Sequence, residues 1–308
     1  MKRFLQTILI VLVLLLVISI PFDYAFSNYL SHSKARKYDV WNDIIYGSVD
    51  ANLLVLGSSR AWVQYDTHIL DSMLNTNSYN LGIDGSAINR QMLRYNMYSH
   101  YQNHTPKVVL MNVDYMSTLG WTIGYEREQF FPYFHIEYAG KEMKEVEPFS
   151  LGELYLPMFR YYKQGVYSTF LESSDDKTLF KGYEGKDREW DGTQYSKIES
   201  FHFSKNGKTE QAFDEFLSQL KEQDVKVVFV YAPVYIGLTN KVDNLSDCYE
   251  TFQYYSEKYQ IPVLDYTYYY LSYDTAHFYN ATHLNKTGAE LFTTKLCHDL
   301  DSLGILQN

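Results

Sequence analysis

The stretch ANLLVLGSSR, residues 51–60, decides the fold because it joins a short apolar run to a glycine and two serines. An apolar run of this length, bounded by turn residues, is typical of a strand buried on both faces of a parallel sheet. The same pattern returns further along the chain, at residues 78–85, 107–114, 225–235 and 261–266.

Helical segments separate most of these strands, at about 86–101, 209–224 and 244–259, and a last helix follows His283. Its start is marked by Asn285, a good N-cap residue. Strands that alternate with helices predict an α/β fold, a doubly wound (flavodoxin-like) parallel sheet of about five strands. We expect one such domain over 51–308. Residues 115–208 interrupt the alternation, and we interpret them as an insertion that serves as a lid or in substrate recognition.

The N-terminus predicts one transmembrane helix. Lys2 and Arg3 precede the apolar run 4–20, which is just long enough to cross a bilayer. The positive charges should keep the N-terminus cytoplasmic and the main domain outside a cell membrane. We therefore expect an anchor over 1–20 and a juxtamembrane linker over 21–50. The alternative is a cleaved signal peptide, for which the small residues of AFS (25–27) would suit the cleavage site.

Composition excludes some classes of function. The net charge is −10 and basic residues form only short runs, which argues against a nucleic-acid partner. Cys248 and Cys297 are predicted on helices that cover opposite faces of the sheet, so no disulfide is expected. His100 and His104 lie at a helix end and are interpreted as solvated. We expect neither a metal nor a cofactor.

Polar residues gather where the predicted strands end. In a parallel sheet these ends share one edge, which is where ligands bind. Ser59, Gly85, Asn112 and His283 should all come to that edge. A serine with a histidine to take its proton, and N–H donors for an oxyanion, are what acyl transfer requires.

At these positions the sequence resembles the SGNH (GDSL-type) hydrolase superfamily, through GSSR, NLGIDG, LMNVD and NATHLN. The resemblance covers roughly 51–115 and 225–303. It implies that Ser59 is the nucleophile and His283 the base. It also implies an oxyanion hole made by the backbone N–H groups of Ser59 and Gly85 and by an asparagine side chain. The layout is most similar to membrane-anchored members that handle acyl groups on bacterial cell-surface polymers.

The chain departs from the family pattern at two places. The third block usually reads Gly-x-Asn-Asp, whereas Asn112-Val113-Asp114 stands here. In one register Asp114 takes the asparagine position, where a carboxylate would be a poor oxyanion donor. In the other register Asn112 is the candidate donor. Asn280 occupies the position of the usual aspartate. Its side-chain oxygen can orient His283 but brings no charge, and Asp274 is the alternative acid.

Two matters remain open at the level of the sequence. Arg60 either binds a substrate carboxylate or pairs with an acid at the surface. The chain itself is predicted to be a membrane-anchored serine esterase or O-acyltransferase that acts on an acylated surface glycan or a small acyl ester. The alternatives are a catalytically impaired glycan-binding protein and an accessory subunit of a membrane acyltransferase partner.

Overall fold

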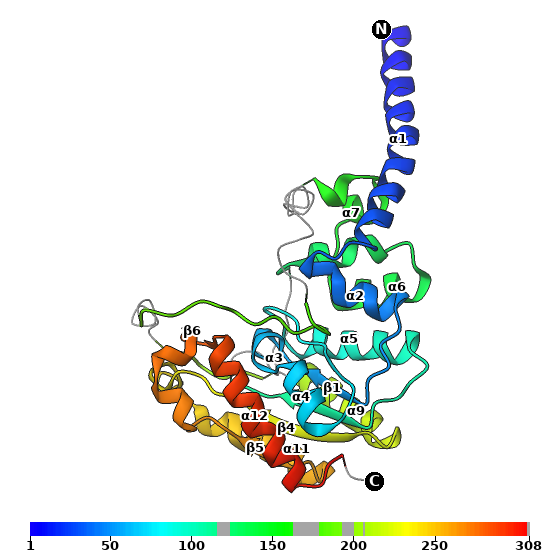
Figure 1. Ribbon diagram of the computed structural model, residues 1–308. Helices are drawn as coiled ribbons and strands as arrows, with labels where there is room; N and C mark the ends of the chain where they lie inside the picture. Colours follow the sequence, from blue (N-terminus) through cyan, green and yellow to red (C-terminus); the bar gives the residue numbers. More distant parts are fainter. Residues whose placement is uncertain (116–123, 163–178, 193–199, 206, 307–308) are drawn as a thin grey trace. The chain divides into compact units, whose positions relative to one another are not determined.

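A computed structural model describes residues 1–115, 124–162, 179–192, 200–205 and 207–306 (Figure 1). The chain forms two compact units, one of Met1–Asp43 with Ile123–Thr178 and one of Ile44–Thr122 with Leu179–Asn308. The span 115–208, predicted as one insertion, is thus shared between them. The first unit takes its middle part, and the second takes the rest.

The second unit contains a parallel sheet in the order β2-β1-β3-β4-β5, the order of flavodoxin-like folds. The predicted doubly wound α/β fold is confirmed. The strands are β1 (Leu53–Leu56), β2 (Ser78–Asn80), β3 (Val108–Asn112), β4 (Lys226–Tyr231) and β5 (Val263–Asp265). The helices are α3 (Ser59–Gln64), α4 (Thr67–Leu74), α5 (Ile88–Tyr101), α9 (Gly207–Glu222), α10 (Ile236–Thr239), α11 (Leu245–Tyr259) and α12 (Lys286–Ser302).

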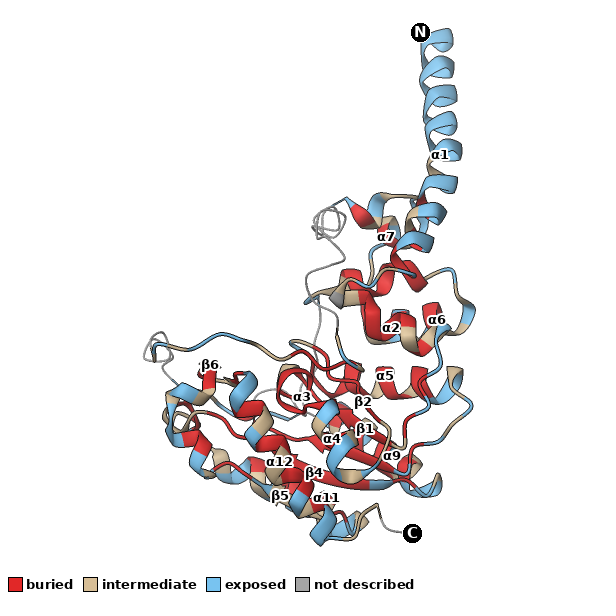
Figure 2. Cartoon of the chain, in the orientation of Figure 1, coloured by how far each residue is buried: buried red, intermediate tan, exposed pale blue. Residues whose placement is uncertain are grey.

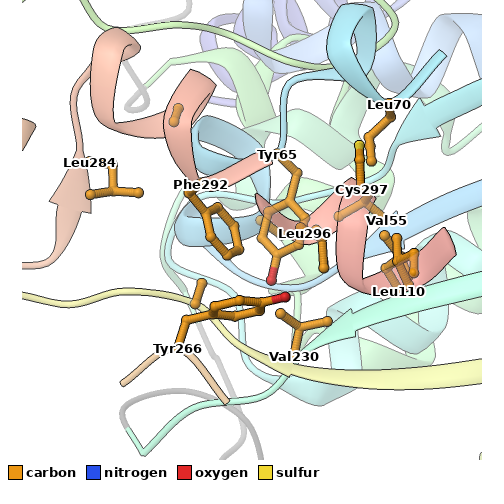
Figure 3. Packing of buried hydrophobic residues seen from close by; sticks show 14 of the residues in the cluster. Val55, Tyr65, Leu70, Leu110, Val230, Tyr266, Leu284, Phe292, Leu296 and Cys297 are labelled. Carbon is orange, nitrogen blue, oxygen red and sulfur yellow. The ribbon is translucent and has the colours of Figure 1, made fainter. Parts of the chain in front are cut away.

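The sheet is covered on both faces because alternate strand residues point to opposite sides. Val228 and Val230 belong to a core shared with α3, α4 and α12, and Figure 3 shows Val230 near Phe292 of α12. Phe229, between them, packs instead on Phe213 of α9, with ring centroids 6.2 Å apart. Burial is nearly complete along β1, β3 and β4 (Figure 2).

The two cysteines are buried and free, Cys248 in α11 and Cys297 in α12. The stretch between β5 and α12 was not predicted from the sequence. Beyond β5 the chain forms two 3-10 turns, η4 (Tyr270–Tyr273) and η5 (Thr275–His277), and then an antiparallel pair, β6 (Phe278–Asn280) with β7 (His283–Leu284).

The first unit is built around α1 (Lys2–Leu30), in the described residues the one helix long and apolar enough to cross a membrane. The other elements are α2 (Arg36–Tyr46), whose end lies in the second unit, η1 (Arg127–Tyr133), α6 (Glu137–Val146), α7 (Leu151–Tyr155) and η2 (Phe159–Tyr161). Figure 2 shows that α1 is exposed along most of its length and buried near its C-terminal end. There Leu30 packs with Tyr38, Phe131 and Tyr161.

Candidate active site

Ser59 is the first residue of α3 and follows β1 through a turn that only glycine can make. Gly57 has φ +154°, and a Cβ placed there would lie 2.6 Å from the Cβ of Ala61 and 2.8 Å from that of Asn112. Such contacts are too close for any side chain. The turn leaves Ser58 buried and Ser59 partly exposed at the carboxyl edge of the sheet.

The turn after β2 packs directly on the backbone of α3. Asn80 donates from Nδ2 to the carbonyl of Ala61 (2.7 Å) and accepts from the N–H of Gly82 (2.9 Å). A Cβ on Gly82 would lie 2.3 Å from the backbone nitrogen of Trp62. Asn80 therefore links the second strand to the helix that carries Ser59. This role of Asn80 was not predicted, although an asparagine two residues before a glycine at a strand end is a signal for such a turn.

His283 lies on a tight strand pair next to the last helix. Asn280 of β6 faces His283 of β7 across the pair. Immediately afterwards Asn285 caps α12, because its side chain accepts from the N–H of Gly288 at 2.9 Å. The predicted cap is confirmed. Gly288 allows α12 to lie close to the backbone of His277, since a Cβ at Gly288 would lie 2.3 Å from the carbonyl oxygen of His277.

Ser59 and His283 are in hydrogen-bonding contact, with 2.7 Å between Oγ and Nε2. On the other side of the ring, Nδ1 lies 2.9 Å from Oδ1 of Asn280 and 2.7 Å from Oγ1 of Thr282. Thr282 donates to the same Oδ1 from its backbone N–H and its hydroxyl, each at 2.9 Å. Its hydroxyl oxygen is thereby free to accept the proton of Nδ1.

These contacts set the tautomer of His283. Both neighbours of Nδ1 act as acceptors, so the ring carries its proton there and presents an unprotonated Nε2 to the hydroxyl of Ser59. Asn280 thus orients the ring as an aspartate would, without a charge. Thr282 is the functional residue that sequence reasoning missed. The available signal was its position directly before His283, in the two-residue link between Asn280 and His283.

The pKa of His283 is lowered to about 3, first by burial and then by the positive charges of Arg60 and Lys186, against the opposing effect of Asp114. Burial disfavours the charged ring, and nearby cations disfavour it further. The ring is therefore neutral at physiological pH. The same surroundings would make an imidazolium at this position costly to form.

Arg60 pairs with Asp114, and both side chains are almost wholly buried. The partner of Arg60 is an acid, as one interpretation of the sequence held, but the pair lies inside the protein and not at the surface. Asn112 belongs to the same network. It accepts from the hydroxyl of Tyr65 (2.8 Å) and donates from Nδ2 to Asp114 (3.2 Å). One of the two hydrogens of its amide is thus directed at Asp114.

Asp274, the alternative acid, lies beside another histidine. It accepts from the N–H of Ala276 at 3.0 Å and so caps η5, and its carboxylate is 3.9 Å from Nε2 of His277.

Gly85, the other residue predicted for the oxyanion hole, stands in a turn with φ +59° after β2.

Residues 184–188 border the site and come from the predicted insertion. The N–H of Glu184 donates to the carbonyl of Trp62 (3.4 Å), next to the Ser59 turn. Arg188 lies over the ring of Tyr279, 5.7 Å from its centroid, and that ring stacks on His283 at 5.3 Å. Aromatic and cationic side chains therefore line one side of the Ser59–His283 pair.

No protein-family model matches the chain, and no curated protein is similar to it in sequence. Among solved structures, it is similar to a GDSL-like lipase from Bacteroides thetaiotaomicron, with 12% identity, a TM-score of 0.38, and coverage of 89% of this chain and 98% of the other. A protein described as a possible lipase from Chitinophaga pinensis has the same identity and TM-score, with coverage of 82% and 98%.

Proposed function

We propose that the chain is a membrane-anchored serine esterase or O-acyltransferase of the SGNH type. The observation that carries the proposal is the continuous hydrogen-bonded chain from Ser59 Oγ through both nitrogens of His283 to Asn280 and Thr282. A serine whose proton faces an unprotonated imidazole nitrogen at 2.7 Å is prepared for nucleophilic attack.

The reaction would proceed in two halves. As Ser59 Oγ attacks the ester carbonyl, its proton passes to Nε2 of His283. The imidazolium then returns that proton to the departing alkoxide, which leaves an acyl group on Ser59. In the second half, His283 takes a proton from water or from a sugar hydroxyl as that oxygen attacks the acyl-serine. The bond between the acyl group and Oγ then breaks, and the imidazolium returns the proton to Ser59 Oγ, which restores the starting pair.

The oxyanion formed in each half needs hydrogen-bond donors. The backbone N–H groups of Ser59 and Gly85 are our proposed donors, in keeping with the resemblance at GSSR and NLGIDG. Asn112 would act as a third donor through the second hydrogen of its amide, while the first is donated to Asp114.

The anchor is proposed to remain uncleaved. Cleavage after Ser27 would remove Asp23, which pairs with Arg160, and would break the hydrogen bond between Ser27 and Tyr161 (2.7 Å). Arg160 would lose its partner charge, a costly outcome for a largely buried cation. With Lys2 and Arg3 held in the cytoplasm, the second unit would face outward.

An acylated surface glycan is the proposed substrate, because an outward-facing, membrane-tethered site meets polymers of the cell envelope. Arg188, which lies over the ring of Tyr279 beside His283, would give such a substrate a cationic hydrogen-bond donor at the edge of the site. In this proposal Arg60 does not bind substrate but holds Asp114 and keeps His283 neutral.

Turnover of p-nitrophenyl acetate by the purified full chain tests the proposal. We expect a burst of acyl-enzyme on Ser59, detected by its mass, and loss of turnover in Ser59→Ala. Adding a sugar acceptor then separates transfer, which yields an acylated sugar, from hydrolysis. If the wild-type chain turns over no ester but, when immobilised on a column, binds an acylated glycan, the chain is a glycan-binding protein instead.

A further inference from the structure

The last turns of α1 form part of the core of the first unit. Asp23 accepts from the N–H of Met158 (2.7 Å) and pairs with Arg160. One turn further on, the hydroxyl of Ser27 lies 2.7 Å from that of Tyr161. Helix α1 and the segment from α7 to η2 are therefore fixed relative to each other, within one unit.

These contacts fix the depth of that segment if α1 crosses a bilayer. At 1.5 Å per residue, the distance along the helix from Lys2 to Asp23 is about 32 Å. This is close to the hydrocarbon thickness of about 30 Å. With Lys2 at the inner surface, Asp23 comes to the outer boundary. Met158 and Arg160, which it holds, come to the same level.

Helix α7 presents opposite sides of different character. Glu153 is buried, where it accepts from Ser150 in a capping box and pairs with Arg127. Leu151 and Tyr155, one turn apart, lie on the other side of the helix, and each is 75% exposed. The polar contacts hold the helix in place so that its apolar side faces outward.

Exposed apolar side chains continue from α7 into η2. They are Leu151, Tyr155, Leu156, Phe159 and Tyr162, which we call the α7–η2 patch. Large exposed apolar groups that gather in one place mark an interaction surface. Tyrosine and leucine are also the side chains that favour the boundary between lipid headgroups and acyl chains.

We propose that the α7–η2 patch inserts into the outer membrane interface and is a second, peripheral attachment of the first unit to the bilayer. The inference rests on the proposed anchor, since it uses α1 to set the depth. It commits the patch to lipid and not to another protein, because Asp23 and Ser27 of α1 hold the η2 end of the patch at the level where that helix would leave the bilayer. The first unit would thereby be held at a fixed height and orientation on the surface.

Single labelled cysteines test the proposal. Cys248 and Cys297 are buried, and burial raises the pKa of the Cys297 thiol to about 12. An engineered cysteine should therefore be labelled selectively. We would attach an environment-sensitive fluorophore to Tyr155→Cys, to Tyr254→Cys as an exposed control on α11, and to Leu14→Cys in α1. Each full chain is reconstituted into vesicles of phosphatidylethanolamine and phosphatidylglycerol.

We expect the label at 155 to shift its emission to the blue and to be quenched by lipids that carry a spin label near the headgroup. The label at 14 should be quenched by deep spin labels and the label at 254 by neither. Quenching at 14 without quenching at 155 would overturn the α7–η2 proposal alone. No quenching at either position would overturn the anchor as well. Shielding at 155 that disappears when the protein is diluted in lipid would mean contact with a second copy, and would also overturn it.

Discussion

The Ser59 turn and the His283 strand pair are held by different forces. Around Ser59 the backbone itself fits so closely that Gly57 and Gly82 have no room for a methyl group. Around His283 the ring is held by side-chain hydrogen bonds from Asn280 and Thr282. The proposed nucleophile is thus positioned by the backbone of the fold, and the proposed base by a few side chains that can be substituted. Substitutions near Ser59 should act on stability, whereas those near His283 should act on chemistry.

The largest effect is expected from His283→Ala. Because this residue is the proposed base and acid in both halves of the reaction, kcat/KM on an activated ester should fall by about four orders of magnitude. Thermal unfolding should change little. His100→Ala, an exposed histidine of α5, is the matched control and should retain full activity. A His283→Ala variant that keeps a tenth of its activity would exclude His283 as the base.

The second-largest effect is expected from Gly82→Ala, which lies beside the Ser59 turn and should change stability. The added methyl would meet the backbone of Trp62, so the β2 turn and α3 must separate. We expect a loss of about 3 kcal/mol in the free energy of unfolding, measured with denaturant. Gly207→Ala is the control, because nothing lies within 4 Å of the added carbon. Equal stability of the two variants would show that the turn after β2 can move away from α3 at little cost in free energy, and would contradict this account.

Asn280→Asp should raise activity and change its pH dependence. A carboxylate beside Nδ1 would stabilise the imidazolium, so kcat/KM should rise about tenfold, or ~1.4 kcal/mol of barrier. It should also raise the pKa of His283. The wild-type base, with a pKa of about 3, is protonated only as the pH falls towards that value, so its activity should stay level down to pH ~5. The variant should lose activity at a higher pH.

Asp274→Asn controls this experiment. An asparagine can still cap η5, so the rate and its pH profile should be unchanged. If instead Asn280→Asp had no effect and Asp274→Asn abolished activity, Asp274 would be the partner of His283.

The smallest effect is expected from Thr282→Val. Valine keeps the shape of the side chain and the backbone N–H but removes the hydroxyl that accepts from Nδ1. We expect a cost of about 1 kcal/mol in the barrier, a roughly fivefold fall in kcat. Thr282→Ser should restore the rate, since it restores the hydroxyl. A serine variant as slow as the valine variant would show that the methyl group matters instead.

The strands were predictable because burial on both faces demands uninterrupted apolar runs such as Leu53–Leu56. The cap at Asn285 was predictable because a local side-chain hydrogen bond determines it. The pair β6–β7 was not, since strands this short carry no periodicity. The direction of the Asn112 amide was also hidden, because it depends on Tyr65 and Asp114, which the fold brings to it.

The end of α1 illustrates the same limit. The apolar run marks only the part of a helix that faces lipid, so the sequence suggested a span ending at residue 20. The helix continues to Leu30. Its later turns carry Asp23 and Ser27, polar residues whose partners come from a segment more than a hundred residues away. Hydropathy could not reveal contacts of that kind.

Labelling with a fluorophosphonate probe, followed by mapping of the modified peptide, tests most directly the claim that Ser59 is an activated nucleophile. The full chain should be labelled on Ser59. Ser58→Ala should keep the label, because Ser58 is buried at the start of α3, and Ser59→Ala should lose it. A label on Ser58, equal labelling of Ser59→Ala, or no labelling of the wild-type chain would contradict the proposed catalytic site.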